Sequence, residues 1–309
     1  MKIIHVDKNN PLLINNLEKQ GHENIIAYKK TKSEILKIIH NYDGLIIRSR
    51  FTIDKPFLIK SKKLKFIARV GSGTENIDID FAKSLKIKII SAPKGNSNAV
   101  GEHALGMLLS LLNNINIAEK SISNGKWQRK VFKGTELKSK VIGIIGFGNT
   151  GKSFAEKLKG FNSEIIYYDI KKIKSNDLYK QVELSELTKR SNIVSLHIPQ
   201  TKFTIKMINK SFIKKMKKQF WIINTSRGKI IETKDLVWGL KNKKILGAAL
   251  DVLEYETSSF EKLFIKKNKE LDYLINSDKV ILTPHIAGLS EESEKKLAKI
   301  ISNKIKQIS

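Results

Sequence analysis

The chain has 309 residues, and none of them is cysteine. Without cysteine there is no disulfide, no thiolate nucleophile and no cysteine-ligated metal, and we expect no metal centre. No run of residues approaches the roughly 18 apolar positions that a membrane-spanning helix needs. The first residues, Met1–Asp7, look like a strand and lack the basic-then-apolar layout of a signal peptide. These absences predict a soluble, cytoplasmic protein with no membrane partner.

Acidic side chains are also scarce, with 30 Asp and Glu against 58 Lys and Arg, which gives a net charge of +28. Such an excess is found in proteins that bind nucleic acid or anionic membranes. Here the lysines are spread along the whole chain, often in pairs such as Lys62-Lys63 and Lys217-Lys218. No basic segment is interleaved with aromatic side chains. We therefore expect a solvated basic surface and no specific nucleic-acid partner.

Two stretches of the chain alternate between strand-like and helix-like patterns. In the first, the strand-like runs are Lys2–Val6, Asn24–Ala27, Gly44–Ile47, Leu64–Val70 and Ile87–Ile90. In the second they are Val141–Ile145, Glu164–Tyr168, Ile193–Leu196, Phe220–Asn224, Ile245–Leu250 and Val280–Leu282. This alternation predicts an α/β protein with parallel sheets covered by helices on both faces. Between the stretches, residues 99–123 are predicted to form one long, buried helix in which His103 packs or caps rather than catalyses.

The strand at Val141–Ile145 runs into a glycine motif, Gly146-x-Gly148-x-x-Gly151. In a dinucleotide-binding turn the first glycine allows the tight bend, the second lets the backbone approach a pyrophosphate, and the third lets helix and strand pack closely. Asp169 ends the next predicted strand, about 20 residues after Gly146, where a carboxylate accepts hydrogen bonds from an adenosine ribose. The motif, the strand and the carboxylate together predict a dinucleotide site.

Ligands of open parallel sheets bind beyond the carboxyl ends of the strands. In the first stretch the loops at these ends are 48–50, with the sequence Arg-Ser-Arg, and 71–76. Paired guanidinium groups suit a carboxylate or phosphate, although a pair of surface arginines fits the residues equally well. The 71–76 loop either cups an anion or turns the chain. In the second stretch, the loops after the strands supply a basic group, acidic groups and an imidazole, which are the groups that hydride transfer to a carbonyl needs.

The chain resembles the D-isomer-specific 2-hydroxyacid dehydrogenases over essentially its whole length. The matching stretches are Arg69–Asp78, Gly95–Ala104, Gly146–Gly151, Asn224–Gly228, Ala249–Val252 and Leu282–His285. Several independent motifs occur in the right order. Within the family the chain is most similar to the short D-3-phosphoglycerate dehydrogenases, chiefly because of Arg48-Ser49-Arg50.

The resemblance implies a catalytic set of Arg227, Glu256 and His285. Arg227 would bind the substrate carboxylate, His285 would exchange a proton with the C2 oxygen, and Glu256 would hold the imidazole. Glu256 departs from the family pattern, because Thr257 follows it where the family usually has proline, and Glu254 is near enough to compete. The spacing from Asp251 favours Glu256. The charged segment 257–279 is longer than in the family, and we interpret it as a surface insertion.

The resemblance also implies the binding residues. Those for the cofactor are Gly146, Gly148, Asn149, Thr150, Gly151, Asp169, Ile198, Thr225, Asp251, Ser72, Val100 and Gly288. Those for the substrate are Arg48, Ser49, Arg50, Ser72, Gly73 and Asn76. A carboxylate at Asp169 would repel a 2′-phosphate and favours NAD, while Lys171 and Lys172 nearby leave NADP open.

The family architecture implies a flavodoxin-like substrate domain, residues 1–96 plus 290–309, and a Rossmann NAD-binding domain, residues 97–289. The chain would pass from one domain to the other at Asn96–Val100 and again at Pro284–Leu289, and these two crossings would form a hinge. The long helix would build a homodimer or larger homo-oligomer. We expect a small 2-hydroxy or 2-keto acid as the substrate. The leading hypothesis is oxidation of D-3-phosphoglycerate to 3-phosphohydroxypyruvate with NAD, in serine synthesis. The alternatives are a reductase of glyoxylate, hydroxypyruvate or another 2-keto acid, and an NAD-sensing binding protein of corepressor type.

Overall fold

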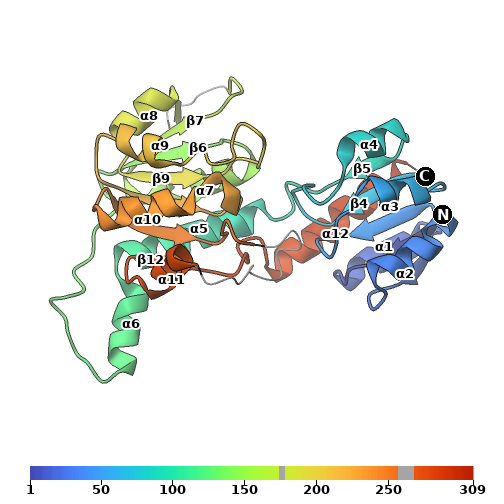
Figure 1. Cartoon of the computed structure of the whole chain (residues 1–309), viewed down its shortest axis with the longest axis horizontal. Coiled ribbons are helices and arrows are strands. Elements are labelled where there is room, and N and C mark those ends of the chain that lie inside the picture. Colours follow the sequence, from blue (N-terminus) through green and yellow to red (C-terminus); the bar gives the residue numbers. More distant parts are fainter. Residues whose placement is uncertain (174–177, 257–267, 309) are drawn as a thin grey trace. The chain divides into compact units, whose positions relative to one another are not determined.

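The computed structural model describes residues 1–173, 178–256 and 268–308 (Figure 1). These residues form two compact units. Unit 1 consists of residues 1–97 and 289–308, and unit 2 of residues 98–256 and 268–288. Thr257 and the first part of the predicted insertion lie outside the described residues. Among the residues that the structure describes, no helix has both the length and the apolarity to cross a membrane.

Unit 1 is built on a parallel sheet in the order β2-β1-β3-β4-β5. Its strands are β1 (Lys2–His5), β2 (Glu23–Ile26), β3 (Gly44–Ile47), β4 (Phe66–Arg69) and β5 (Lys88–Ile90). Every pairing in this sheet is parallel. The order is that of the flavodoxin-like doubly wound fold, which confirms the predicted class of this part.

Helices cover both faces of the unit 1 sheet, and alternate residues of each strand supply the two cores. On one face α1 (Pro11–Lys19) and α12 (Glu291–Lys306) pack on a core that includes Ile3 and Phe66. On the other, α2 (Lys32–Ile38), the 3-10 turn η1 (Ile39–Asn41), α3 (Lys55–Lys60) and α4 (Ile79–Ser84) cover a core that includes Ile4 and Ile67. Ile3 and Ile4 are neighbours in β1, so they point to opposite faces.

Unit 2 is built on a second parallel sheet, in the order β12-β11-β10-β9-β6-β7-β8. Its strands are β6 (Val141–Ile145), β7 (Glu164–Tyr168), β8 (Lys180–Gln181), β9 (Ile193–Leu196), β10 (Phe220–Asn224), β11 (Ile245–Leu250) and β12 (Val280–Leu282). The chain runs outward from β6 through β7 to β8 and then returns to β9 on the other side of β6. A ligand crevice opens at such a reversal of strand order. The predicted Rossmann class is confirmed; the short edge strand β8 was not predicted.

The unit 2 sheet is also covered on both faces. One face carries α5 (Ser97–Leu112), α7 (Asn149–Lys157) and the 3-10 turn η2 (Lys159–Phe161). The other carries α8 (Leu184–Arg190), α9 (Lys210–Lys215), α10 (Thr233–Lys241) and α11 (Lys269–Asn276), with the 3-10 turn η3 (Gly228–Ile230) just before α10. The first β–α turn and the loops after β9, β10, β11 and β12 therefore meet at one edge of a rigid sheet, which is the edge where the candidate site lies.

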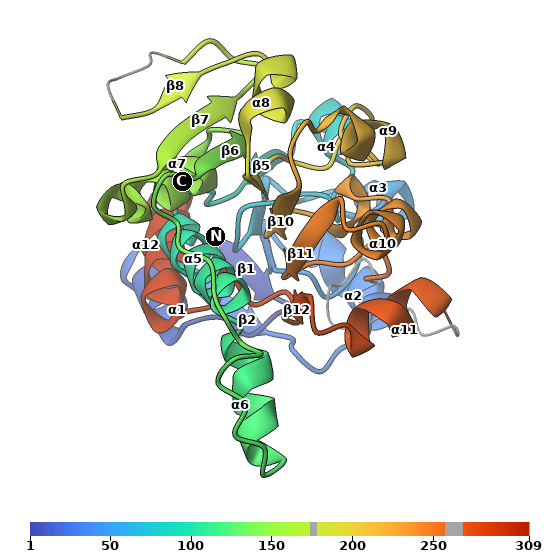
Figure 2. The ribbon, with the colours of Figure 1, turned by 90° about the vertical axis from the view of Figure 1, so that its left-hand side faces the viewer.

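The prediction of one helix over residues 99–123 is wrong, because the segment forms two helices. Asn114 lies between α5 and α6 (Ile115–Ser123) with φ +55°, and asparagine tolerates this left-handed conformation better than most residues. The apolar pattern hides this break because it continues through both helices. Figure 2 shows α6 extending away from the body of unit 2, and Ile115 and Ile122 on it are more than half exposed.

The described part of the predicted insertion is also not a simple surface segment. Residues 269–276 form α11, which Asn268 caps by accepting from the amides of Glu270 and Leu271. Leu271 and Leu274 are buried against the rest of unit 2.

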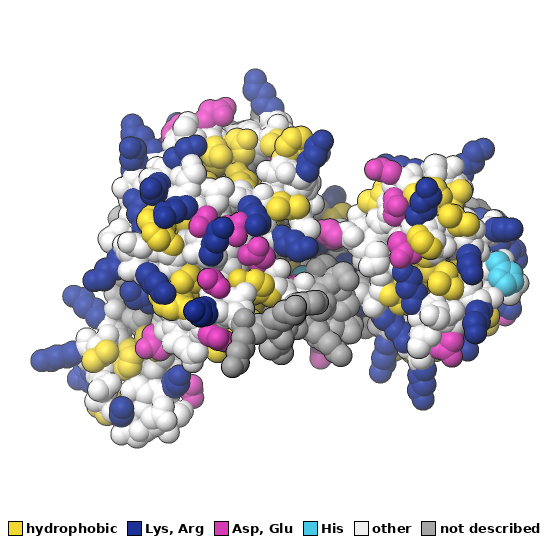
Figure 3. Space-filling view, in the orientation of Figure 1, with side chains coloured by type: hydrophobic (Ala, Val, Ile, Leu, Met, Phe, Trp, Pro, Cys, Tyr) yellow, Lys and Arg dark blue, Asp and Glu magenta, His cyan; other side chains and the backbone are white. Residues whose placement is uncertain are grey.

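Figure 3 shows the basic side chains dispersed over the visible face with acidic ones among them. No single basic platform stands out on that face.

Candidate active site

The glycine turn after β6 has little room for side chains. Gly146 has φ +92°, and a Cβ there would lie 2.6 Å from the carbonyl oxygen of His197. A Cβ at Gly151 would overlap the carbonyl oxygen of Gly146, so α7 can pack this close only without one. Beside Gly148, in contrast, a Cβ would meet nothing within 4 Å. The turn is thus closed against the sheet and open at the residue where a bound pyrophosphate needs backbone access.

Asp169, just after β7, is tied to this turn. Its Oδ2 accepts from the amide of Phe147 at 2.8 Å, and its Oδ1 from the amide of Lys171 at 2.9 Å. An ionised carboxylate has about four acceptor positions, so each oxygen can still accept from a ribose hydroxyl. Lys171 and Lys172 are exposed beside it. The structure thus fixes the Asp169 carboxylate against the glycine turn from two sides.

The residues present fit a bound dinucleotide. No side chain caps the start of α7 at Gly148, so the first amides of the helix, including those of Asn149 and Thr150, can receive an anion. Ile198 borders the turn, with its Cγ2 2.7 Å from the Cβ that Gly146 lacks. Thr225 Oγ1 is buried and has no hydrogen-bond partner within the described residues. Such an atom is costly unless a ligand or water satisfies it.

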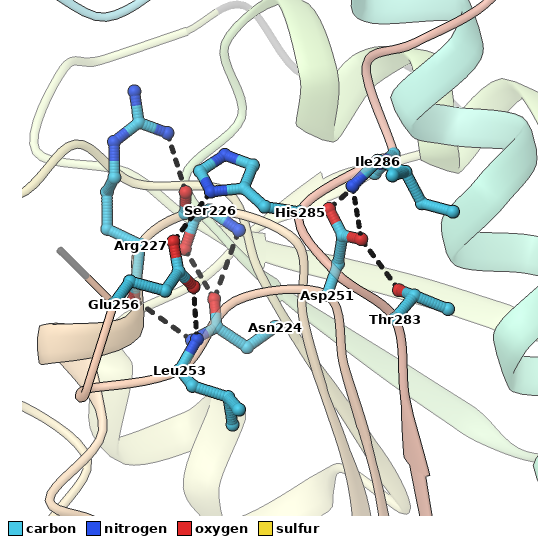
Figure 4. A network of polar contacts seen from close by, with 10 residues as sticks. Asn224, Ser226, Arg227, Asp251, Leu253, Glu256, Thr283, His285 and Ile286 are labelled. Carbon is cyan, nitrogen blue, oxygen red and sulfur yellow. Dashed lines mark hydrogen bonds and ion pairs between the residues drawn. The ribbon is translucent and has the colours of Figure 1, made fainter. Parts of the chain in front are cut away.

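His285 and Glu256 form the closest acid–base pair of the site (Figure 4). The Nδ1 atom of His285 lies 2.7 Å from Oε2 of Glu256, and the two side chains are 24% and 12% exposed. The other oxygen of Glu256 accepts from the amide of Leu253. His285 has φ +56°, and its amide donates to the carbonyl of Asp251 at 2.8 Å. The backbone of the loop after β11 thus holds both members of the pair.

Glu254, which competes with Glu256 on sequence grounds, has another partner. Its Oε2 accepts from the amide of Thr233 at 3.0 Å and from the hydroxyl at 2.8 Å, at the first residue of α10. A carboxylate at that position satisfies helix-terminal amides and opposes the helix dipole. The structure therefore pairs His285 with Glu256 and uses Glu254 to begin a helix.

Arg227 lies in the loop after β10, which Asn224 braces from inside. Asn224 is fully buried, donates to the carbonyl of Arg227 at 3.0 Å and accepts from the amide and hydroxyl of Ser226. The guanidinium donates to the carbonyl of Ser226 at 2.6 Å. A Cβ at Gly228 would overlap the carbonyl of Leu253. The arginine loop and the Glu256 loop are therefore packed backbone to backbone, and Figure 4 shows both beside His285.

Asp251 organises the loop that carries His285. Its side chain is 1% exposed; Oδ1 accepts from Thr283 Oγ1 at 2.6 Å and from the amide of Ile286 at 2.8 Å, and Oδ2 accepts from the amide of Ala287 at 2.9 Å. The sequence placed Asp251 beside the cofactor and missed this clamp. No local pattern signals it, because the partners lie more than 30 residues further along the chain.

The predicted substrate loops belong to unit 1, where Arg48 and Arg50 have different partners. The guanidinium of Arg50 donates to the carbonyls of Val6 and Ala27 at 2.8 and 3.3 Å, so it ties together the ends of β1 and β2. The guanidinium of Arg48 lies 3.7 Å from the carboxylate of Glu294 and is partly exposed. The two arginines therefore do not form the matched pair that their spacing suggests.

The other predicted binding residues fall into two groups. In unit 1, Asn76 is buried and donates at 3.3 Å to the carbonyls of Arg48 and Phe51, while Ser72 donates to Asn96 at 2.6 Å. Half-buried Ser49 and Gly73 lie in the same loops. In unit 2, Val100 is buried in the first turn of α5, and Gly288 lies three residues after His285 as the last residue of the unit.

His197 follows β9, next to the predicted cofactor residue Ile198, yet its chemistry is that of a core residue. Its Nε2 lies 2.8 Å from Ser195 Oγ, and its ring lies 5.5 Å from that of Phe154. Complete burial lowers the pKa of His197 to about 3. It is therefore neutral near pH 7 and cannot act there as a proton donor in exchange with a ligand.

A doubly wound domain with this glycine turn, its anchored carboxylate and a His–Glu pair beyond its strand ends belongs to the class of dinucleotide-binding dehydrogenase domains. The model for the D-isomer specific 2-hydroxyacid dehydrogenase NAD binding domain matches residues 105–287, and the chain belongs to this family.

Relatives within the family carry different names. The hydroxypyruvate reductase of Thermotoga maritima is 36% identical over 274 residues, 89% of this chain and 87% of the relative. The D-3-phosphoglycerate dehydrogenase of Archaeoglobus fulgidus is 32% identical over 308 residues; these are 99% of this chain but only 56% of that relative. The D-lactate dehydrogenase of Aquifex aeolicus, solved with NAD and lactic acid, is 26% identical with a TM-score of 0.85, covering 99% of this chain and 94% of the other.

Proposed function

We propose that the protein is an oxidoreductase that interconverts a D-2-hydroxy acid and its 2-keto acid with NAD. The observation that carries the proposal is the 2.7 Å contact between His285 and Glu256, together with the packing of the Glu256 loop against the loop of Arg227. These loops follow strands of the same sheet that carries the glycine turn. One sheet edge thus offers a dinucleotide site and a proton-exchange group.

Each of the three side chains has a defined role in this reaction. NAD, when bound, supplies the hydride acceptor. Arg227 binds the substrate carboxylate and polarises the C2 oxygen, as a planar guanidinium suits. His285 exchanges the hydroxyl proton through the ring nitrogen that faces away from Glu256, because hydride loss without proton loss would leave a protonated ketone of high energy. Glu256 keeps a proton on Nδ1 and fixes the orientation of the ring.

Asp169 supports NAD over NADP as the cofactor. Its carboxylate is fixed by two backbone amides at the end of β7, and a 2′-phosphate there would meet a negative charge that cannot turn away. Lys171 and Lys172 are the features that favour NADP. Initial rates with the two cofactors at equal concentration distinguish these cases.

D-3-phosphoglycerate is the substrate we propose, with 3-phosphohydroxypyruvate as the product. Support comes from Arg48, whose guanidinium is partly exposed, and from relatives named D-3-phosphoglycerate dehydrogenase. The second candidate is a glyoxylate or hydroxypyruvate reductase. It is favoured by the engagement of Arg50 with two backbone carbonyls, which leaves only Arg48 of the predicted pair for a phosphate, and by relatives named for those reactions.

Arg48 offers the test of the substrate. Replacing it with alanine removes a charged hydrogen bond, so the KM for D-3-phosphoglycerate should rise about tenfold or more while glyoxylate turnover changes little. Arg50→Ala is the matched control, because its loss should lower stability and affect both substrates alike. Equal losses of the two activities in Arg48→Ala would refute the phosphate assignment.

The domain roles and the assembly complete the proposal. Residues 1–96 with 290–309 would bind the substrate, residues 97–289 the cofactor, and the protein would be a homodimer through α5 and the arm of α6. Support for the dimer comes from exposed Ile115 and Ile122 on α6 and from exposed Trp127 and Val131 in the segment that follows it. Analytical ultracentrifugation tests the dimer.

An NAD-sensing binding protein is the alternative class, and NADH formation from a D-2-hydroxy acid excludes that class.

A further inference from the structure

His103 on α5 contacts the loop of His285 through a hydroxyl. Its Nε2 lies 3.0 Å from Oγ1 of Thr283, which lies 2.6 Å from Oδ1 of Asp251. The direct distance from His103 Nε2 to that carboxylate oxygen is 3.6 Å, too long for a good hydrogen bond. The three side chains come from α5, the loop after β12 and the end of β11, all within unit 2. Figure 4 shows the hydrogen bonds that Asp251 accepts from Thr283 and from Ile286.

Proton counting fixes the direction of these bonds. A threonine hydroxyl has one proton. Thr283 is within reach of the Asp251 carboxylate at 2.6 Å and of the sulfur of Met107 at 3.8 Å, and an ionised carboxylate is much the stronger acceptor. The hydroxyl therefore donates to Asp251, so His103 must carry a proton on Nε2 and donate to the Thr283 oxygen. The chain of donors runs from α5 to the buried carboxylate.

The same carboxylate holds the backbone on both sides of His285. It accepts from Thr283 before the histidine and from the amides of Ile286 and Ala287 after it. His285 itself sits at φ +56°, a conformation that costs a histidine energy and persists only where its surroundings enforce it. We infer that His103 is a positioning residue for His285 that acts through Thr283 and Asp251. The catalytic consequence rests on the proposed function; the structural coupling does not.

The attachment of α5 does not depend on this hydrogen bond. Ala104 and Leu108 are fully buried under the sheet, and a Cβ at Gly101 would lie 2.6 Å from Ser153 Oγ, so the helix is held by close packing on α7. His103 is 22% exposed and adds a polar contact at the edge of that packing. Removal of the His103 side chain should therefore change the geometry of the His285 loop but lower the stability of unit 2 only slightly.

Nitrogen-15 histidine spectra test the coupling without any turnover. The chain has six histidines, so their ring signals can be assigned by single substitutions. In His103→Leu the signals of His285 should shift, and in His103→Gln, whose amide can still donate, they should stay near those of the wild type. In Thr283→Val the His285 signals should likewise shift, and in Thr283→Ser, which keeps the hydroxyl, they should stay near those of the wild type. The exposed His40→Leu serves as a control and should leave His285 unchanged.

Kinetics then measure the consequence. His103→Leu should lower kcat about tenfold with little change in the KM for NAD, and the double variant with Thr283→Val should lose no more than either single one. His285 signals that are unchanged in both His103→Leu and Thr283→Val would overturn the inference, as would a His103→Gln variant as impaired as His103→Leu. An inactive wild-type protein with the shifted His285 signals would instead refute the proposed function and leave the coupling standing.

Discussion

Gly228 and Leu253 lie so close that a Cβ atom at position 228 would overlap the carbonyl oxygen of Leu253. The two residues belong to separate loops, one carrying Arg227 and the other carrying Glu256. Their backbone contact is therefore the physical link between the arginine and the carboxylate that orients the imidazole of His285. No side chain at position 228 is compatible with it.

Gly228→Ala should separate these loops. The added methyl meets backbone atoms that cannot turn aside, so the free energy of unfolding should fall by about 1–3 kcal/mol and kcat should fall with it. Urea unfolding and initial rates measure the two effects. Gly160→Ala is the matched control, since a Cβ there meets nothing within 4 Å and should change stability by about 0.5 kcal/mol or less. A Gly228→Ala variant with wild-type stability and rate would contradict the link.

Glu256 and Glu254 should differ sharply in effect although they are two residues apart. Glu256→Gln removes the charge that faces His285 and should lower kcat by about 10–100-fold while the fold stays intact. Glu254→Gln weakens the start of α10 and should cost about 1 kcal/mol of stability with kcat nearly unchanged. Turnover and urea midpoints of both variants provide the comparison. A larger loss of kcat in Glu254→Gln would reverse their roles.

Asp169 should determine which dinucleotide the protein uses. Asp169→Asn keeps an oxygen that can accept from one backbone amide but removes the charge that a 2′-phosphate would meet. The preference for NAD over NADP, measured as a ratio of kcat/KM values, should fall by about tenfold or more, and most of the change should be a gain with NADP. Tm values that match the wild type show that the turn is intact. An unaltered ratio would mean that Asp169 does not read the ribose.

The buried imidazole of His197 should make the protein sensitive to acid. Burial holds the pKa of His197 near 3 in the folded protein, against about 6.5 when unfolded. Between these two pH values the unfolded chain binds one more proton than the folded protein. The contribution of His197 to the free energy of unfolding is therefore fully present above pH 6.5 and is lost as the pH drops towards 3. Between pH 7 and pH 5 this histidine alone should cost about 2 kcal/mol.

The variant His197→Leu tests this dependence. It should unfold with a flatter dependence on pH over that range, even if it is less stable at pH 7, where Ser195 has lost its partner. His40→Leu, an exposed position, should keep the wild-type slope. Urea unfolding at several pH values gives the slopes. If all three proteins share one slope, the buried histidine is not the source of the acid sensitivity.

The sequence predicted the strands well and the tertiary partners poorly. Strands such as Val141–Ile145 and Phe220–Asn224 match residue for residue, because buried parallel strands are short apolar runs with clear ends. The break at Asn114 was missed, since the apolar pattern crosses it. The partners of Arg50 and His103 were missed for another reason. Whether a guanidinium meets a ligand or two carbonyls, and whether an imidazole meets a hydroxyl 180 residues away, depends on packing that no local pattern carries.

The most direct test of the account is NADH formation followed by absorbance, with D- and L-isomers of 2-hydroxy acids, for the wild type and for His285→Asn. Asparagine is the substitution of choice because it tolerates the left-handed backbone that position 285 requires. The account predicts NADH from a D-isomer with the wild type, no turnover of the L-isomer, and a rate at least about a thousandfold lower in the folded variant. Undiminished NADH formation by His285→Asn would contradict it.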